Sequence, residues 1–465
     1  MDRPIRRLLL FFTLIFLALI VQLTYVQVWA APKYKVHPAN TRAIEEEMKV
    51  ERGAIISADG VELAVNRKEG QYFLRQYPQG ALVSPWLGYN SLRYGRAGIE
   101  RIYNEELSGQ SGLLGITGYW DRILGRAHRG ADLKLTINMA VQAAAADALG
   151  QRKGAVVALD PRTGEVLAMV SYPRYDPNLI DEEWDDITSD PDRPLINRPS
   201  YGLYPPGSVF KIIVASAGLQ EGVVEPDTQF VDEGTVMAGG YQVRNYDDRV
   251  YGEHTFTKAF ASSINTTFAK VGVSLGADTL AAYAEDFGFD KVIPFPLGGS
   301  ESLFPDPDGM DKAHVAQASF GQGEVLATPL EMALSAAAVA NRGQIMEPYI
   351  VSQVVDYHQN VLSQTKPGVW LKPISAETAA QMTGLMVEAV NSGTGTAAAI
   401  EGVQVAGKTG TAEVADAEPH AWFAGFAPAS APEVVVAVLV ENGGSGGSVA
   451  APIAREVIAA ALRSR

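Results

Sequence analysis

Ser208 and Lys211 are the first residues whose types and spacing suggest chemistry. They lie three positions apart in residues 204–211 (YPPGSVFK), where proline and glycine indicate a turn and the apolar residues predict a helix. A serine at a helix N-terminus lies among N–H groups that favour developing negative charge, and a lysine three residues later shares its face. If burial lowers its pKa, that lysine can take the serine proton. Alone the pair is weak, because an N-capping serine followed by a surface lysine gives the same pattern.

A second candidate is Ser263 with Asn265, in residues 262–265 (SSIN). In an extended loop, side chains two positions apart would point into one cleft. A hydroxyl there can relay a proton, and an amide can hold a peptide group. An ordinary helix cap explains the run equally well.

The third candidate is residues 408–411 (KTGT), inside a predicted strand. The edge of a strand binds an extended peptide through backbone hydrogen bonds, and Gly410 would let that peptide approach closely. Lys408 would supply positive charge, while Thr409 and Thr411 would offer hydroxyls to a carboxylate. A strand that happens to carry a glycine is the plain alternative.

The order of the three runs is far more specific than any one of them. S-x-x-K, S-x-N and K-T-G with long spacings resemble the serine penicillin-recognising enzymes. Further runs look like segments of the class B penicillin-binding proteins, and the resemblance extends over nearly the whole chain. These runs are residues 52–55 (RGAI), 98–100 (GIE), 319–323 (SFGQG) and 421–425 (AWFAG), while 91–95 (SLRYG) looks like penicillin-binding protein A of actinobacteria.

The resemblance implies a role for each candidate residue. Ser208 would be the acylated nucleophile and Lys211 its base, while Ser263, supported by Lys408, would relay a proton to the leaving amine. Asn265 would orient the acyl peptide. The oxyanion hole would consist of the backbone N–H groups of Ser208 and Thr411, and the substrate's terminal carboxylate would contact Thr409 and Thr411. The family uses no metal or organic cofactor, and β-lactams acylate its serine.

The strands and helices expected around these residues indicate an α+β domain. Two early strand runs and three late ones are separated by a long, mostly helical stretch, with a helix at either end. The simplest assembly is a five-stranded antiparallel sheet flanked by helices, with a helical lobe inserted. The expected strands are residues 155–159, 165–171, 403–414, 421–427 and 434–440, and the terminal helices are 137–149 and 450–462.

The N-terminal part predicts a membrane anchor. Residues 8–30 contain no charged side chain and follow three arginines, and at about 1.5 Å per residue a helix of this length crosses a bilayer core. One such run predicts a single span of the cell membrane. The basic residues before it favour a cytoplasmic N-terminus and therefore an extracytoplasmic catalytic domain. A cleaved signal peptide is the rival reading. The expected division is a cytoplasmic tail (1–7), the anchor (8–30), a small extended pedestal (31–130) and the main domain (131–465).

Composition excludes several other kinds of site. The net charge of -15 argues against nucleic acid as a partner, and the absence of cysteine excludes disulfides and thiol nucleophiles. The six histidines are scattered without zinc-site spacing. Residues 443–447 (GGSGG) match the hydrolase motif G-x-S-x-G, but no Asp or His follows Ser445, so we interpret the run as a flexible glycine turn. The acidic segment 181–192 is expected to be a solvated loop.

Three functions fit these observations. The leading one is a D,D-transpeptidase that cross-links peptidoglycan stem peptides ending in D-Ala-D-Ala, in division or elongation. The second is hydrolysis by the same acyl-enzyme, as a carboxypeptidase or β-lactamase. The third is a non-catalytic scaffold or a β-lactam sensor. About 100 residues before the main domain are too few for a glycosyltransferase, so a separate membrane polymerase is the expected partner.

Overall fold

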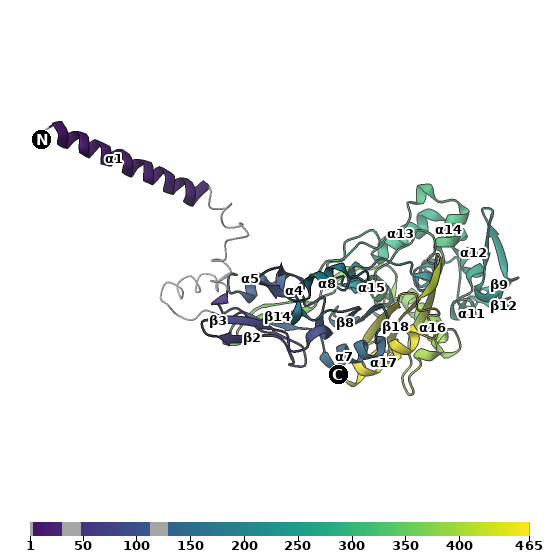
Figure 1. Cartoon of the computed structure of the whole chain (residues 1–465). Helices are drawn as coiled ribbons and strands as arrows, with labels where there is room; N and C mark the ends of the chain where they lie inside the picture. Colours follow the sequence, from purple (N-terminus) through teal and green to yellow (C-terminus); the bar gives the residue numbers. More distant parts are fainter. Residues whose placement is uncertain (1–2, 30–47, 112–128, 465) are drawn as a thin grey trace.

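The computed structural model describes residues 3–29, 48–111 and 129–464, which form an N-terminal helix and a body with two large sheets (Figure 1). Helix α1 (Arg3–Thr24) continues into a π-helical turn, η1 (Tyr25–Trp29). The helical span Arg3–Gln27 is long and apolar enough to cross a membrane, and its side chains are exposed. It overlaps most of the predicted anchor.

An antiparallel sheet is the centre of the larger body. Within the described part of the chain it has five strands in the order β17-β18-β19-β7-β8, and every neighbouring pair is antiparallel. The predicted α+β fold class, with early and late strands in one sheet, is therefore confirmed. The strands are β7 (Gly154–Leu159), β8 (Val166–Tyr172), β17 (Ala406–Val414), β18 (Ala417–Ala427) and β19 (Val434–Val440).

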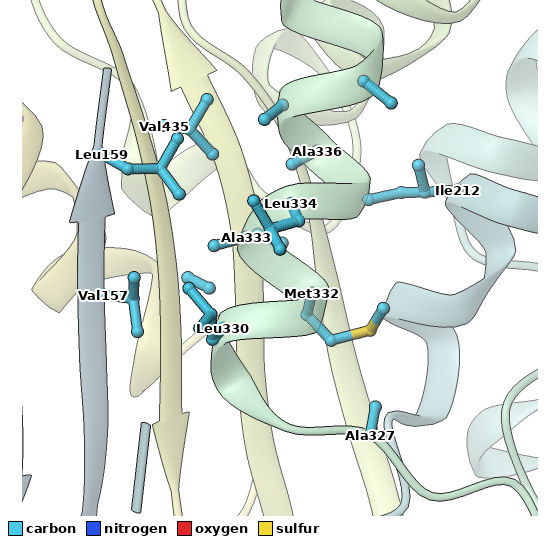
Figure 2. Close-up of a cluster of buried hydrophobic side chains, with 14 of the residues drawn as sticks. Val157, Leu159, Ile212, Ala327, Leu330, Met332, Ala333, Leu334, Ala336 and Val435 are labelled. Atoms are coloured by element: carbon cyan, nitrogen blue, oxygen red, sulfur yellow. The ribbon is translucent and has the colours of Figure 1, made fainter. Parts of the chain in front are cut away.

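Helices cover both faces of this sheet, as the all-apolar, fully buried strand β19 requires. On one face lie α7 (Met139–Leu149) and α17 (Ala450–Arg463). On the other, α15 (Pro329–Ala340) is buried along its whole length between the sheet and α10 (Lys211–Gln220). Figure 2 shows Leu330 and Ala333 of α15 near the strand residues Val157 and Val435, with Ile212 of α10 beyond. The helix that starts at Lys211 is thus fixed against the sheet.

A helical lobe extends from the sheet, together with two pairs of short strands. Strand β9 (Gln229–Asp232) pairs with β12 (Gly252–Thr255), and β10 (Thr235–Ala238) pairs with β11 (Tyr241–Arg244). Figure 1 shows β9 and β12 at the end of the body opposite to β2 and β3. The lobe's helices are α11 (Phe256–Ala261), α12 (Asn265–Leu275), α13 (Ala277–Phe287), α14 (Lys312–Ala318) and α16 (Ala376–Asn391).

A second, six-stranded sheet forms the pedestal, in the order β15-β14-β6-β1-β2-β3. It crosses the domain boundary expected at residue 130, because β6, β14 and β15 all follow that residue in the chain. Strand β1 has two residues and β6 has four, so these short strands need neighbours on both sides to be stable. The strands are β1 (Ile55–Ile56), β2 (Glu62–Glu69), β3 (Tyr72–Gln76), β6 (Asp132–Leu135), β14 (Val351–Val355) and β15 (Val361–Gln364).

A buried ion-pair cluster lies in the pedestal. Glu100, in α4 (Gly98–Ile102), is fully buried and accepts hydrogen bonds from Arg52 Nε at 2.7 Å and Arg75 Nε at 2.6 Å. Burial alone would raise the pKa of Glu100, but the two guanidinium groups outweigh it and hold the pKa below its usual value. Residues 52–55 and 98–100, noted in the sequence, thus meet in one structural cluster.

The acidic segment 181–192 differs in part from the expected solvated loop. Its acidic side chains are largely exposed, but residues Trp184–Ser189 form a short helix, α8. The Trp184 ring stacks on Tyr94 of the pedestal, with ring centroids 4.1 Å apart. Apolar packing in this segment therefore joins the two parts of the body. The acidic composition of the segment gave no sign of this contact.

Candidate active site

Ser208 lies in a 3-10 turn, η4 (Gly207–Phe210), which leads directly into α10 at Lys211. Gly207 has a φ of 54°, and a Cβ there would lie 3.0 Å from the carbonyl oxygen of Thr411. Its N–H donates to the Gly321 carbonyl at 2.9 Å. Only glycine fits this position, and the close contact with β17 brings Ser208 and Thr411 together.

Lys211, three residues after the candidate nucleophile, is completely buried. Its Nζ donates to the Ser263 carbonyl at 2.9 Å and to Asn265 Oδ1 at 2.7 Å, with Ser263 Oγ 3.2 Å away. Burial, reinforced by the positive charge of Lys408, lowers the pKa of Lys211 well below its usual value. A neutral amine keeps two N–H donors, which match the carbonyl and the amide oxygen, and its lone pair is left to accept a hydroxyl proton.

Ser263 and Asn265 do not lie in the extended loop that the sequence suggested. They belong to a tight connection between α11 and α12, in which Ser263 has a left-handed φ of 59° and Asn265 begins α12. The turn folds the Ser263 carbonyl and hydroxyl toward Lys211. Asn265 Nδ2 donates to the Arg244 carbonyl at 3.1 Å, so Asn265 also connects Lys211 to the segment after β11.

Lys408 is the second fully buried lysine of the site. Its Nζ donates to the Thr409 carbonyl at 2.9 Å and lies 5.7 Å from the centre of the Phe260 ring. Burial lowers the pKa of Lys408 to about 7. Two amines with lowered pKa values therefore lie beneath one cleft, a pattern typical of proton-transfer sites.

Strand β17 is the edge strand of its sheet, as peptide binding along residues 408–411 requires. Thr409, Thr411 and Glu413 alternate along it and line the same cleft as Ser208. The structure shows a packing reason for glycine at position 410, in addition to the substrate approach that we predicted. A Cβ there would lie 2.9 Å from the Pro206 carbonyl oxygen, so glycine permits packing against the nucleophile turn.

The cleft has a volume of about 920 Å³ and includes Ser208, Ser263, Asn265, Thr409 and Thr411. It therefore brings together residues far apart in the sequence, above the two buried lysines. Sequence reasoning missed several other lining residues. Glu413 continues the period-two pattern of β17 and could have been found that way, whereas no motif marked Thr394, Thr396, Ser448 or the residues between Tyr241 and Tyr251.

Ser445 also lines the cleft, although we excluded it as a nucleophile. The Gly446 N–H donates to Thr411 Oγ1 at 3.3 Å, and a Cβ at Gly446 would lie 2.2 Å from the Gly410 carbonyl oxygen. The glycine turn is thus packed against β17, which corrects our interpretation of it as merely flexible. Its glycines allow this close approach.

A second layer of side chains supports the nucleophile turn. Trp422 of β18 is fully buried and its Nε1 donates to the Pro205 carbonyl at 3.0 Å. The hydroxyl of Tyr204 donates to Glu441 Oε1 at 2.7 Å, and Arg198 donates to the same oxygen at 2.8 Å. Among the described residues, no group of three His, Asp or Glu side chains is arranged to hold a metal ion.

Comparisons with known proteins identify the family. The family described as the penicillin binding protein transpeptidase domain matches residues 154–459, and the penicillin binding protein A dimerisation domain matches residues 52–133. The peptidoglycan D,D-transpeptidase PbpA of Mycolicibacterium smegmatis is 38% identical, with 100% of this chain and 99% of that protein aligned.

Solved structures show the same architecture. Penicillin-binding protein A of M. tuberculosis, as its penicillin G acyl-enzyme complex, superposes with a TM-score of 0.83 at 38% identity, covering 89% of this chain and 100% of that one. The D,D-transpeptidase domain of a peptidoglycan glycosyltransferase from Eggerthella lenta gives 0.83 at 38% identity, covering 90% and 99%. Since the transpeptidase family matches residues 154–459 and a relative 38% identical aligns with the whole chain, the chain belongs to the class B penicillin-binding protein transpeptidases.

Proposed function

We propose that this protein is a peptidoglycan D,D-transpeptidase that works through an acyl-enzyme on Ser208. The observation that carries the proposal is the environment of Lys211. Its amine is buried, has a pKa well below the usual value, and is held by Ser263 and Asn265 one helical turn from Ser208. A lowered pKa increases the share of neutral amine, and the neutral amine can accept the proton of the attacking hydroxyl. The PbpA relatives carry the same named activity.

Acylation would follow from this arrangement. Ser208 Oγ attacks the carbonyl carbon of the penultimate D-Ala while Lys211 takes the hydroxyl proton. The backbone N–H groups of Ser208 and Thr411 stabilise the negative charge on the carbonyl oxygen. The C–N bond to the terminal D-Ala then breaks. Its nitrogen receives the proton from the Lys211 ammonium through Ser263 Oγ, which lies 3.2 Å from Nζ.

The remaining candidates would hold the substrate. Thr409 and Thr411 of the edge strand contact the terminal carboxylate, with Gly410 between them shaping the strand, while Asn265 orients the acyl peptide. The positive charge available at Lys408 favours both the carboxylate and the proton relay through Ser263. Transfer is completed when an amine of a neighbouring stem peptide attacks the carbonyl carbon of the Ser208 ester. The ester C–O bond then breaks, and the amine's proton passes through Lys211 to Ser208 Oγ.

Labelling with a fluorescent penicillin tests the nucleophile. We expect wild-type protein to form a covalent adduct and Ser208→Ala to form none. Ser445→Ala is the matched control, because Ser445 lines the same cleft, and this variant should be labelled normally. Labelling of Ser208→Ala, or loss of labelling in Ser445→Ala alone, would refute the assignment.

The lifetime of the adduct separates the proposal from its rivals. A transpeptidase should keep the penicilloyl ester for many minutes, whereas a β-lactamase would release it rapidly. A non-catalytic scaffold would be indicated if Ser208→Ala restored growth to a strain lacking this protein. Neither rival is favoured by a feature of the cleft.

We also propose that α1 anchors the protein as a single membrane span, with the catalytic body outside the cytoplasm. Its length, its hydropathy and the arginines before residue 8 support this. A separate membrane glycosyltransferase would supply the glycan strands, because the two matched families describe dimerisation and transpeptidase domains. A reporter that is active only outside the cytoplasm tests this topology. We expect it to be active when it is fused after residue 30 and also when it is fused at the C-terminus.

A further inference from the structure

One wall of the cleft carries exposed aromatic rings together with planar polar side chains. Tyr241 is 42% exposed and Tyr246 is 57% exposed, and both line the cleft that contains Ser208. They belong to a segment that runs from β11 through η5 (Tyr246–Asp248) toward β12. Apart from the buried Asn245, we name the cleft-lining residues of this segment the tyrosine rim: Tyr241, Gln242, Arg244, Tyr246, Asp247, Asp248, Arg249 and Tyr251.

The tyrosine rim stands on a fixed base. Val243, between its exposed neighbours, is 1% exposed and packs with Phe320 and other residues of a small apolar cluster. Asn245 is buried as well: its Nδ2 donates to Asp232 Oδ2 at 2.8 Å, and its Oδ1 accepts from the Thr266 N–H at 3.1 Å. The exposed rings therefore stay exposed because their backbone is held in place, and not because the segment lacks contacts. A surface prepared in this way loses little entropy when it binds.

The composition of the rim favours a neutral ligand with both apolar and polar faces. Two arginines and two aspartates balance in charge, so the rim offers no strong attraction to a polyanion or a polycation. Exposed tyrosine rings provide flat apolar faces with a polar edge. Amide, guanidinium and carboxylate groups provide planar sets of donors and acceptors for hydroxyl and acetamido groups. N-acetylhexosamine rings have this combination of a C–H face and a polar periphery.

We propose that the tyrosine rim binds the glycan chain that carries the stem peptide, with sugar rings against Tyr241 and Tyr246. The inference rests on the proposed function, which places a stem peptide in the same cleft. The rim is continuous with the site, because Asn265 Nδ2 donates to the Arg244 carbonyl at 3.1 Å while its Oδ1 binds Lys211. It lies in the lobe whose strands β9 and β12 are at the end of the body away from the pedestal (Figure 1).

A pair of substrates tests this assignment. The release of D-alanine is measured with the full-length protein in detergent, using a free pentapeptide and the same pentapeptide attached to its disaccharide. We expect Tyr241→Ala/Tyr246→Ala to lower kcat/KM for the disaccharide-linked substrate about tenfold more than for the free peptide, since each stacked ring contributes about a factor of three. Tyr357→Ala is the matched control, because Tyr357 is 53% exposed and lies outside the cleft.

Equal losses on the two substrates would assign the rim to the peptide and overturn the proposal, as would no loss on either. A second measurement does not depend on turnover. In an NMR titration with a tetramer of N-acetylglucosamine, the ring signals of Tyr241 and Tyr246 should shift while that of Tyr357 should not. If the protein released D-alanine from neither substrate, the proposed function would fail, and this titration would still decide whether the rim binds sugar. No shift at millimolar tetramer would refute it.

Discussion

The two buried lysines under the cleft, Lys211 and Lys408, which we call the floor, differ from the tyrosine rim in their exposure to solvent. On the floor, Lys211 and Lys408 are fully buried, and their amines bind groups of the protein itself. At the rim, Tyr241 and Tyr246 leave about half of their surface to solvent. Burial changes the acid–base chemistry of an amine, whereas exposure leaves a ring free to contact a ligand.

This difference indicates where each part of the function resides. The floor is set before any substrate arrives, because the pKa shifts of its lysines come from the fold. The exposed rings of Tyr241 and Tyr246 are free to contact a substrate, as the proposed glycan binding requires. Asp232 links the two regions, since it binds Asn245 under the rim and Thr266 in the first turn of α12. Changes on the floor should therefore alter chemistry, and changes at the rim should alter substrate preference.

The largest effect is expected from Lys211→Gln. Removal of the base should slow acylation by penicillin about a thousandfold, the usual contribution of general-base catalysis. Stopped-flow labelling measures the rate, and thermal unfolding checks that the variant is folded. Lys366→Met is the control, because Lys366 is exposed outside the cleft and the variant should be acylated at the wild-type rate. A loss of less than tenfold in Lys211→Gln would remove Lys211 from the role of base.

Lys408→Met should change how stability depends on pH. The folded-state pKa of Lys408 is about 7, below its unfolded value, so the unfolded chain binds more protons between about pH 7 and 10. The free energy of unfolding of the wild type therefore rises with pH in that window, by about 1.4 kcal/mol per pH unit for each such lysine. Lys408→Met should lose that share of the slope between about pH 7.5 and 9.5 in urea titrations. An unchanged slope would show that Lys408 is solvated.

Glu331 offers the same test with the opposite sign, away from the cleft. It is fully buried in α15, neither carboxyl oxygen has a hydrogen-bond partner among the residues that the structure describes, and burial raises its pKa to about 8. The folded chain then binds more protons than the unfolded chain between about pH 4.5 and 8, so wild-type stability falls as pH rises. The stability of Glu331→Gln relative to wild type should increase by about 1.4 kcal/mol per pH unit from pH 5 to 7.5. A constant difference in stability between Glu331→Gln and the wild type over this range would contradict the raised pKa of Glu331.

The contrast between floor and rim also separates the residues that the sequence predicted from those that it did not. Ser208, Lys211, Ser263 and Lys408 belong to runs with a recognisable order, and the strand runs of the central sheet were visible without the structure. The geometry of the Ser263 turn was not, because a left-handed serine follows from the contacts around it and not from local propensity. The packing role of Gly410 depended on residues two hundred positions away.

The rim and the pedestal sheet were hidden for a related reason. Tyr241 and Tyr246 carry no periodic pattern, and only the fold places them in the same cleft as Ser208. Strand β14 joins the pedestal by pairing with β6, more than two hundred residues earlier in the chain, which a linear division into domains cannot show. Local patterns identify elements, but long-range pairing decides which elements share a sheet.

The smallest effect on acylation is expected from Trp422→Phe, in the layer of side chains that supports the nucleophile turn. Trp422→Phe keeps an aromatic ring in the core but removes the N–H that binds the Pro205 carbonyl at 3.0 Å. The loss of one buried hydrogen bond should lower the free energy of unfolding by about 1 kcal/mol. A slightly looser nucleophile turn should slow penicillin acylation about threefold, with no change in the preference between glycan-linked and free peptides. Trp184→Phe, which keeps a ring against Tyr94 outside the cleft, should leave acylation unchanged. A shift in substrate preference in Trp422→Phe would mean that floor and rim are coupled more tightly than the hydrogen bonds through Asn265 and Asp232 require.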